Sequence, residues 1–243
     1  MCTIGAKKLN GSWFLIKTRD PVPWMRWDDE IKLFDSKADK FRKLIIQNPD
    51  PNEDGYYGGI NEKGVAFVAT YVGVAENQVS YIRRPYVRLV LDALDAKEAV
   101  EIIKSFNPRI GGNMFVADSN NCFVIEGSAS EYFIEEVQSE MVRTNHFLNL
   151  PYENMSFSKP NFREWSHGRF DRANELIREA KNFDDLKNLL RDRENAKSKT
   201  AICRVGSEEE CFTHSAFIFD TVNCKAHYAQ GNPLENNFEE FSF

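Results

Sequence analysis

The start of the chain is predicted to be a β-hairpin, and this limits the folds open to the rest. Residues 2–9 and 12–18 have the composition of two short strands, and Asn10-Gly11 separates them. An Asn-Gly pair is typical of a two-residue hairpin turn, because both central positions need a positive φ. The chain is therefore expected to begin as two antiparallel strands.

Strand-like and helix-like segments then follow in an order typical of layered α+β proteins. Apolar residues have a helical spacing in residues 86–106, 170–180 and 183–191. Alternation and turn residues predict further strands at 64–73, 114–118, 122–126, 132–137, 142–147, 201–205, 215–219 and 226–230. Strands, then helices, then strands again, with hairpins throughout, predict an α+β domain with mainly antiparallel sheets.

Residues 20–58 lack a regular period and are predicted to leave the sheet as a long excursion. The segment contains Pro21, Pro23, Trp24 and Trp27, then a charged stretch, then the turn-forming residues of 48–59. Excursions of this length often shape functional sites.

Composition and charge exclude several classes of protein. The chain has 243 residues, which suits one domain spanning 1–243. Lys and Arg total 31 against 37 Asp and Glu, a net charge of −6, so neither a nucleic-acid nor an anionic-membrane partner is expected. No apolar run approaches the roughly 18–20 residues of a membrane-spanning helix, and no signal peptide is evident. A cytoplasmic protein is expected, and homo-oligomers are common in that class.

The cysteines and histidines do not form a metal or cofactor motif. The five cysteines are scattered without a Cys-x-x-Cys pair, and the four histidines have no His-Glu-x-x-His spacing. A glycine-rich nucleotide-binding loop does not occur either. No disulfide framework, metal or other cofactor is therefore expected.

Cys2 is the residue with the clearest chemical potential. Removal of Met1 would leave a thiol and a free α-amine on one residue, so the amine could accept the thiol proton. Their reference pKa values, about 7.7–8.0 and about 8.5, suit that transfer. Asp20, after the second strand, could hold the amine through a charge-assisted hydrogen bond. The alternatives are an incidental cysteine near the terminus, an ordinary strand-to-loop aspartate, and a retained Met1 that leaves no free amine.

Six short segments add a family resemblance. They are Met1-Cys2-Thr3, Lys17-Thr18-Arg19-Asp20, residues 59–66 (GINEKGVA), Arg143-Thr144-Asn145-His146-Phe147, residues 166–173 (SHGRFDRA) and Gly231-Asn232-Pro233. In this order, from residue 2 to 233, they resemble the choloylglycine hydrolase and penicillin V acylase family, with the related acyltransferases that act on 6-aminopenicillanic acid. These proteins are N-terminal nucleophile hydrolases.

The resemblance implies a role for each matching residue. Cys2 would supply the attacking sulfur and the α-amine base, and Asp20 would orient that amine. Asn145 would point its side-chain amide into the oxyanion hole, together with the backbone N–H of Tyr71. Arg169 would lie near Cys2 and favour the thiolate.

The sequence departs from the family pattern at several positions. The family's first active-site arginine aligns with Lys17, so either Lys17 replaces it or Arg19 takes the role, and the usual neighbouring Asn is Thr18. Lysine and arginine are not equivalent at a site that needs a planar fork. Where bile-salt hydrolases tend to have Asn and penicillin V acylases Tyr, this chain has Tyr71. Other interpretations stay open for three residues: core packing for Tyr71, a turn residue for Asn145 and a solvated helix end for Arg169.

The resemblance also implies a fold and an activity. The fold would be an αββα sandwich, with two stacked antiparallel sheets and helices outside. The activity would be hydrolysis of a linear, non-peptide carbon–nitrogen amide bond in a small-molecule substrate, through a Cys2 thioester and without a cofactor. Aromatic residues of the excursion would bind an apolar acyl group or pack the loop itself: Trp24, Trp27, Tyr56 and Tyr57. The alternatives are acyl transfer from the same thioester to an amine, a ligand-binding protein without catalysis, and an interaction protein with an exposed apolar patch.

Overall fold

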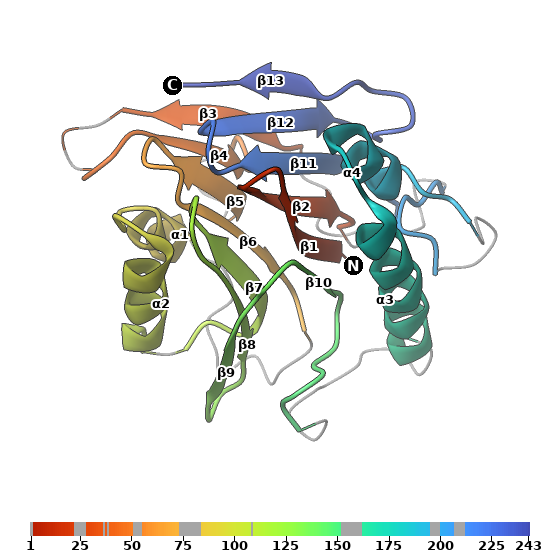
Figure 1. Cartoon of the computed structure of the whole chain (residues 1–243), viewed down its shortest axis with the longest axis horizontal. Coiled ribbons are helices and arrows are strands. Elements are labelled where there is room, and N and C mark those ends of the chain that lie inside the picture. Colours follow the sequence, from red (N-terminus) through yellow and green to blue (C-terminus); the bar gives the residue numbers. More distant parts are fainter. Residues whose placement is uncertain are drawn as a thin grey trace.

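The computed structural model describes residues 2–21, 28–35, 37, 39–50, 55–72, 84–107, 109–151, 162–194, 200–206 and 212–243. Met1, Trp24, Trp27 and Cys211 lie outside the described residues. The described strands form two antiparallel sheets, with helices on their outer sides (Figure 1).

The first sheet contains the predicted hairpin near its centre. Its strand order is β10-β1-β2-β11-β12-β13. β1 (Cys2–Leu9) and β2 (Ser12–Arg19) are paired from Cys2 opposite Arg19 to Leu9 opposite Ser12. Between them, Asn10 and Gly11 have φ angles of 50° and 87°, which the Asn-Gly turn predicts. The other strands are β10 (Glu140–Arg143), β11 (Ser215–Asp220), β12 (Lys225–Gln230) and β13 (Glu239–Phe241).

The second sheet follows the chain in simple order, β3-β4-β5-β6-β7-β8-β9. Each strand therefore pairs with the next one along the sequence, as in a meander. The strands are β3 (Glu30–Phe34), β4 (Lys43–Gln47), β5 (Tyr56–Asn61), β6 (Ala66–Thr70), β7 (Gly112–Ala117), β8 (Cys122–Gly127) and β9 (Tyr132–Glu136).

The inner faces of the two sheets share one apolar core. Its buried members come from both sheets and include Ile4, Leu15, Val68, Phe115 and Phe217. Side chains alternate between the two faces of a strand, so the even-numbered positions of β1 face this core. Cys2 therefore lies on the inner face, at the very end of β1.

Helices cover both outer faces. α1 (Arg84–Val90) and α2 (Ala96–Ser105) pack on the second sheet through a cluster that includes Val87, Ile103 and Phe67. α3 (Phe162–Glu179) and α4 (Phe183–Leu190) pack on the first sheet through a cluster that includes Ile177, Leu186 and Ile218. The four layers confirm the predicted αββα sandwich (Figure 1).

Several segments differ from the sequence prediction. Residues 86–106 form two helices, because Asp95 caps α2 by accepting a hydrogen bond from the Glu98 N–H at 2.8 Å. The expected excursion 20–58 contains β3, β4 and the start of β5, whose polar residues interrupt the alternation. Residues 201–205 form no strand, and the strand expected at 142–147 is 140–143. α3 begins at Phe162, eight positions before the predicted start, because its first turns are polar.

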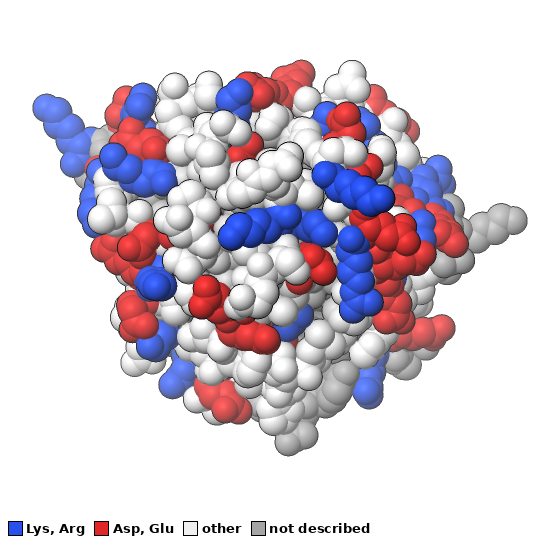
Figure 2. Space-filling model, viewed as in Figure 1, with Lys and Arg blue, Asp and Glu red and all other residues white. Residues whose placement is uncertain are grey.

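The surface carries both signs of charge. On the face shown in Figure 2, Lys and Arg side chains are interspersed with Asp and Glu, so this face has no basic patch of the kind that binds nucleic acid. None of the helices in the described part of the chain has the length and apolarity needed to cross a membrane.

Candidate active site

Two rows of polar side chains close one end of the inner core, one row on each sheet. Cross-strand pairing aligns one row over the first sheet: Cys2, Arg19, Ser215 and Gln230. It aligns the other row over the second sheet: Thr70, Asn113 and Glu126. Directly paired residues share one face of a sheet, so both rows extend the inner faces that form the apolar core.

Asn145 connects the two rows through its side-chain amide. Its Oδ1 accepts hydrogen bonds from the Cys2 backbone N–H at 3.0 Å and from Arg169 Nη2 at 2.8 Å. Its Nδ2 donates to Thr70 Oγ1 at 2.8 Å and to the Tyr71 carbonyl at 2.7 Å. Asn145 is completely buried, and all four hydrogen bonds of its amide group lead to different residues.

The partners of Asn145 determine which way its amide points. Cys2 N–H and Arg169 Nη2 can only donate, and the Tyr71 carbonyl can only accept. A flipped amide would place N–H groups against N–H groups and oxygen against oxygen. The amide oxygen therefore faces Cys2, and both amide hydrogens already have acceptors in this structure.

The backbone around Asn145 is fixed by the polar row of the second sheet. Asn113 Nδ2 donates to the carbonyls of Thr144 and His146, at 2.8 and 2.9 Å, on either side of Asn145. Gly112 allows this position, because it has a φ of 110° and a Cβ there would lie 2.3 Å from the Thr70 carbonyl. Asn113 thereby holds the segment that carries Asn145.

Glu126 anchors the continuation of the same segment. Its carboxylate accepts from Arg143 Nε at 3.0 Å and from the backbone N–H groups of Leu148, Asn149 and Leu150 at 2.9–3.2 Å. Both members of the Glu126–Arg143 ion pair are buried. Burial lowers the pKa of Arg143, and the Glu126 carboxylate opposes that effect.

Residues of α3 close the other side of Asn145. Ser166 Oγ accepts from the Asn145 N–H at 2.8 Å and contacts Thr144 Oγ1 at 3.0 Å and His146 Nδ1 at 2.8 Å. Burial lowers the pKa of His146 to about 3, so its imidazole is neutral at physiological pH. His146 is therefore a packing and hydrogen-bonding residue beside the site.

Arg169 comes from the buried interior of α3. It has no exposed surface, so it is not a solvated helix end. Arg169 Nη2 and the Cys2 backbone N–H donate to the same oxygen, Asn145 Oδ1, so the guanidinium lies close to the Cys2 backbone.

Lys17 lies on the inner face of β2 and is almost completely buried. Its Nζ donates to the Tyr57 carbonyl at 2.7 Å and lies 5.9 and 5.6 Å from the ring centroids of Tyr57 and Phe217. Burial lowers the pKa of Lys17 to about 8, while the nearby Cys2 thiol group raises it.

Arg19 is directly opposite Cys2 and has its own buried network. Its Nη1 lies 3.3 Å from Asp29 Oδ2, its Nη2 donates to Tyr57 OH at 3.0 Å, and its Cζ lies 4.0 Å from the Tyr57 ring centroid. Asp29 also accepts from Ser215 Oγ and from Tyr228 OH, at 2.5 and 2.6 Å. Burial, and then the Asp29 carboxylate, raise the pKa of Tyr228, which keeps its hydroxyl a donor.

Asp20 and Tyr71 follow directly after β2 and β6, at the end of the core where Cys2 lies. Asp20 is buried and accepts from Thr213 Oγ1 at 2.8 Å, while Asn145 is the acceptor for the Cys2 backbone N–H. Tyr71 follows β6 with 43% of its surface exposed, so it is not a core residue. Its carbonyl accepts a hydrogen bond from Asn145 Nδ2.

Three further residues of the site, Thr70, Asn113 and Glu126, lie outside the sequence motifs. Asn113 and Glu126 each occupy an inner position of an otherwise apolar strand, in GNMFVA and CFVIEG. A polar residue at an inner position of an apolar strand needs a hydrogen-bond partner. This pattern is the sequence feature that could have predicted Asn113 and Glu126 as site residues. Among the described residues, no three His, Cys, Asp or Glu side chains lie close enough together to hold a metal ion. A cavity of about 280 Å³ lies beside the hairpin turn, at the other end of β1 from Cys2.

Comparison with known families identifies the family of this chain. The sequence profile of the acyl-coenzyme A:6-aminopenicillanic acid acyl-transferase family matches residues 8–235. The matched region begins after Cys2 and includes the other five predicted site residues. No curated protein matches the sequence.

Several solved structures have the same fold at low sequence identity. Conjugated bile acid hydrolase from Clostridium perfringens, in its C2A mutant, is 13% identical, with 100% of this chain and 97% of that chain covered and a TM-score of 0.61. Penicillin V acylase from Agrobacterium tumefaciens is 12% identical, with 100% and 86% covered and a TM-score of 0.56. A Caenorhabditis elegans N-acylethanolamine-hydrolyzing acid amidase ortholog is 12% identical, with 89% and 92% covered and a TM-score of 0.56. These are N-terminal nucleophile hydrolases, so the sandwich has their fold.

Proposed function

Because the chain belongs to the acyl-coenzyme A:6-aminopenicillanic acid acyl-transferase family, we propose that it hydrolyses a linear, non-peptide carbon–nitrogen amide bond with Cys2 as the nucleophile. One observation carries the proposal. The Cys2 nitrogen is held at 3.0 Å by Asn145 Oδ1, while its side chain points toward the inner face beside Lys17.

The proposed reaction begins once Met1 is removed and Cys2 becomes the first residue. The α-amine accepts the thiol proton, and the sulfur attacks the amide carbonyl. The tetrahedral intermediate collapses to a thioester, and the amine leaves with a proton from the α-ammonium group. Water then attacks the thioester, releases the acid and restores the thiol.

Asn145 has two tasks in this scheme. Its Oδ1 orients the α-amine, the task that the sequence comparison gave to Asp20. Its Nδ2 would stabilise the oxyanion by releasing its hydrogen bond to Thr70 Oγ1 or to the Tyr71 carbonyl and donating to the substrate oxygen instead. A single donor of this kind contributes about 2.7–4 kcal/mol to the stabilisation of the transition state. Arg169 keeps the amide pointing correctly for both tasks.

The direct test is hydrolysis of a panel of amides by the wild-type protein and by Cys2→Ala. The panel contains penicillin V, a conjugated bile acid and an N-acylethanolamine, the compound classes named for proteins of the same fold. We expect at least one amide to be cleaved by the wild type and none by Cys2→Ala. Cys224→Ala serves as the matched control, since this cysteine is also half-buried. Normal hydrolysis by Cys2→Ala would disprove the proposal.

Acyl transfer is the second candidate, because the matched family is described as an acyl-transferase. It uses the same thioester but passes the acyl group to an amine in place of water. Mass analysis of the products formed with a competing amine separates the two reactions. An N-acylated amine as the main product at millimolar amine would identify a transferase, and free acid as the main product would identify a hydrolase.

A further inference from the structure

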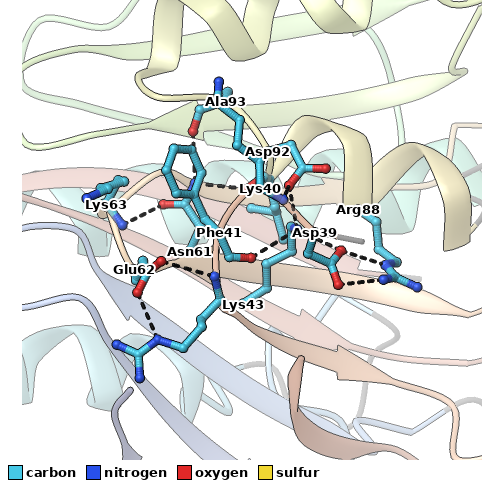
Figure 3. Close-up of polar contacts among 12 residues, drawn as sticks. Asp39, Lys40, Phe41, Lys43, Asn61, Glu62, Lys63, Arg88, Asp92 and Ala93 are labelled. Atoms are coloured by element: carbon cyan, nitrogen blue, oxygen red, sulfur yellow. Dashed lines mark hydrogen bonds and ion pairs between the residues drawn. The ribbon is translucent and has the colours of Figure 1, made fainter. Parts of the chain in front are cut away.

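Among the described residues, Lys43 and Lys17 are the most deeply buried lysines, and their surroundings differ. Lys43 Nζ lies 2.8 Å from Asp39 Oδ1, 2.6 Å from Asp92 Oδ1 and 3.2 Å from the Phe41 carbonyl (Figure 3). Each of its three ammonium hydrogens thus has an acceptor, and two of these acceptors are charged. Arg88 also pairs with Asp39. Lys43 thereby ties the segment before β4 to the end of α1.

Lys17 is equally buried but has a different set of partners. Among the described residues, the Tyr57 carbonyl at 2.7 Å is its one hydrogen-bond acceptor, and no carboxylate lies within 4.0 Å of its Nζ. Its Nζ also faces the rings of Tyr57 and Phe217. A buried ammonium with a single protein acceptor and no carboxylate partner is costly, so its neutral form is within reach. Lys17 has the surroundings of a lysine that gains and loses a proton.

The sheet register places Lys17 next to Cys2. Cys2 is opposite Arg19, and Ile4 is opposite Lys17, so Cys2 and Lys17 are diagonal neighbours on the inner face. Such neighbours lie about 7–8 Å apart, within reach of a long side chain. The Cys2 thiol group is also the largest electrostatic influence on Lys17 after burial.

The other charged groups near Lys17 already have partners. Arg19 pairs with Asp29 and stacks on Tyr57, so its charge is compensated within the site. Asp29 is held by Arg19, Ser215 and Tyr228, and Asp20 by Thr213. Arg19 lowers the pKa of Lys17, whereas Asp29 and Asp20 raise it. The resulting value of about 8 is close to the usual thiol pKa of about 8.5.

We propose that Cys2 and Lys17 share one proton, and that the reactive form of the site is a Cys2 thiolate beside a Lys17 ammonium. In forming this pair, the proton leaves Cys2 Sγ and arrives on Lys17 Nζ through an intervening water, and the net charge is unchanged. The proposal rests on the proposed function, in which Cys2 is the nucleophile. It adds a second route to the thiolate that does not depend on the α-amine. An arginine at position 17 could not accept the proton.

The test is the rate at which limiting iodoacetamide labels Cys2 between pH 5 and 10, followed by intact mass and peptide mapping. Wild type, Lys17→Met and Lys17→Arg are each prepared with a free Cys2 amine and with one residue left before Cys2. Two interacting groups titrate in two steps, so the wild-type rate should rise twice with pH. With one residue left before Cys2, so that the α-amine of Cys2 does not titrate, Lys17→Arg should give a single rise, because the charge of arginine does not titrate. Lys17→Met should label about tenfold more slowly at pH 7, the effect of a thiol pKa one unit higher.

The N-terminal forms separate the two routes to the thiolate. The Lys17→Met effect should appear with and without a free α-amine, and Lys8→Met, an exposed lysine of the same hairpin, should leave the rate unchanged. Thermal unfolding and the labelling rate of Cys224 verify that each variant is folded. Identical curves for wild type and Lys17→Met would overturn the proposal, and so would a single wild-type rise that matches Lys17→Arg. Labelling needs no substrate, so this result stands apart from the amide panel.

Discussion

At the scale of single residues, the account depends on Asn145. Its Oδ1 contacts the Cys2 nitrogen, and its Nδ2, the proposed oxyanion donor, contacts the end of β6, so one side chain connects the proposed nucleophile to the second sheet. The sequence predicted the identity of this residue through the Thr-Asn-His segment. It did not predict the task of orienting the Cys2 nitrogen, because that contact joins residues 143 positions apart.

Replacing Asn145 by Asp separates its two tasks. The carboxylate keeps an oxygen toward Cys2 and Arg169 but removes the only donors of the side chain. We expect kcat to fall by about 100- to 1,000-fold, the effect of losing one oxyanion donor. Steady-state kinetics on a cleaved amide gives this value, with the surface substitution Asn121→Ala as the control. Near-normal kcat in Asn145→Asp would show that the amide oxygen alone matters.

The buried ammonium of Lys17 should make the stability of the protein depend on pH. Its pKa falls from 10.5 in the unfolded chain to about 8 in the folded protein, so the unfolded state binds more protons between these values. The stability of the wild type should therefore rise as the pH increases from 8 to 10.5. At pH 7, the free energy of unfolding of Lys17→Met, measured by urea denaturation, should exceed that of the wild type by on the order of 1–3 kcal/mol. At pH 10 the difference between the two proteins should be smaller. A difference that is the same at both pH values would contradict this account.

At the scale of elements, the strands predicted best are those with a clear apolar alternation. The ends of β1, β2, β7, β8, β11 and β12 were predicted within two residues. In these strands, apolar residues and flanking turn residues mark the strand in the sequence itself. β3, β4 and β5 were missed, because Lys43, Gln47 and Gly58-Gly59 break the alternation. Buried polar residues such as Lys43 make sense only once their partners from other elements are known.

The Glu126 anchor tests how far the second sheet determines the site. Glu126→Gln would leave Arg143 buried without a charged partner and weaken the hold on residues 148–150. We expect a loss of about 3–5 kcal/mol in the free energy of unfolding, measured by urea denaturation. The more exposed pair of Lys7 and Glu140 provides the control, where Glu140→Gln should cost less than about 1 kcal/mol. Equal small losses in both variants would show that Glu126 is not an anchor.

At the scale of the whole molecule, the fold is retained where the sequence is not. Identities of 12–13% extend over 89–100% of this chain, so the fold is shared although few side chains are. The polar rows explain why residues from distant sequence motifs lie close together in the fold. A sandwich that begins its first strand at residue 2 places that residue at one end of the core, and residues from four distant segments then meet it there.

The central claim is that Cys2 is an activated nucleophile. The most direct measurement is the intact mass of the purified protein before and after a brief, limiting dose of iodoacetamide at neutral pH, with the labelled residue mapped. The account predicts a protein without Met1 that gains a single label, on Cys2, far faster than on Cys224 or the buried cysteines. A protein that keeps Met1, or in which Cys2 reacts no faster than Cys224, would contradict it.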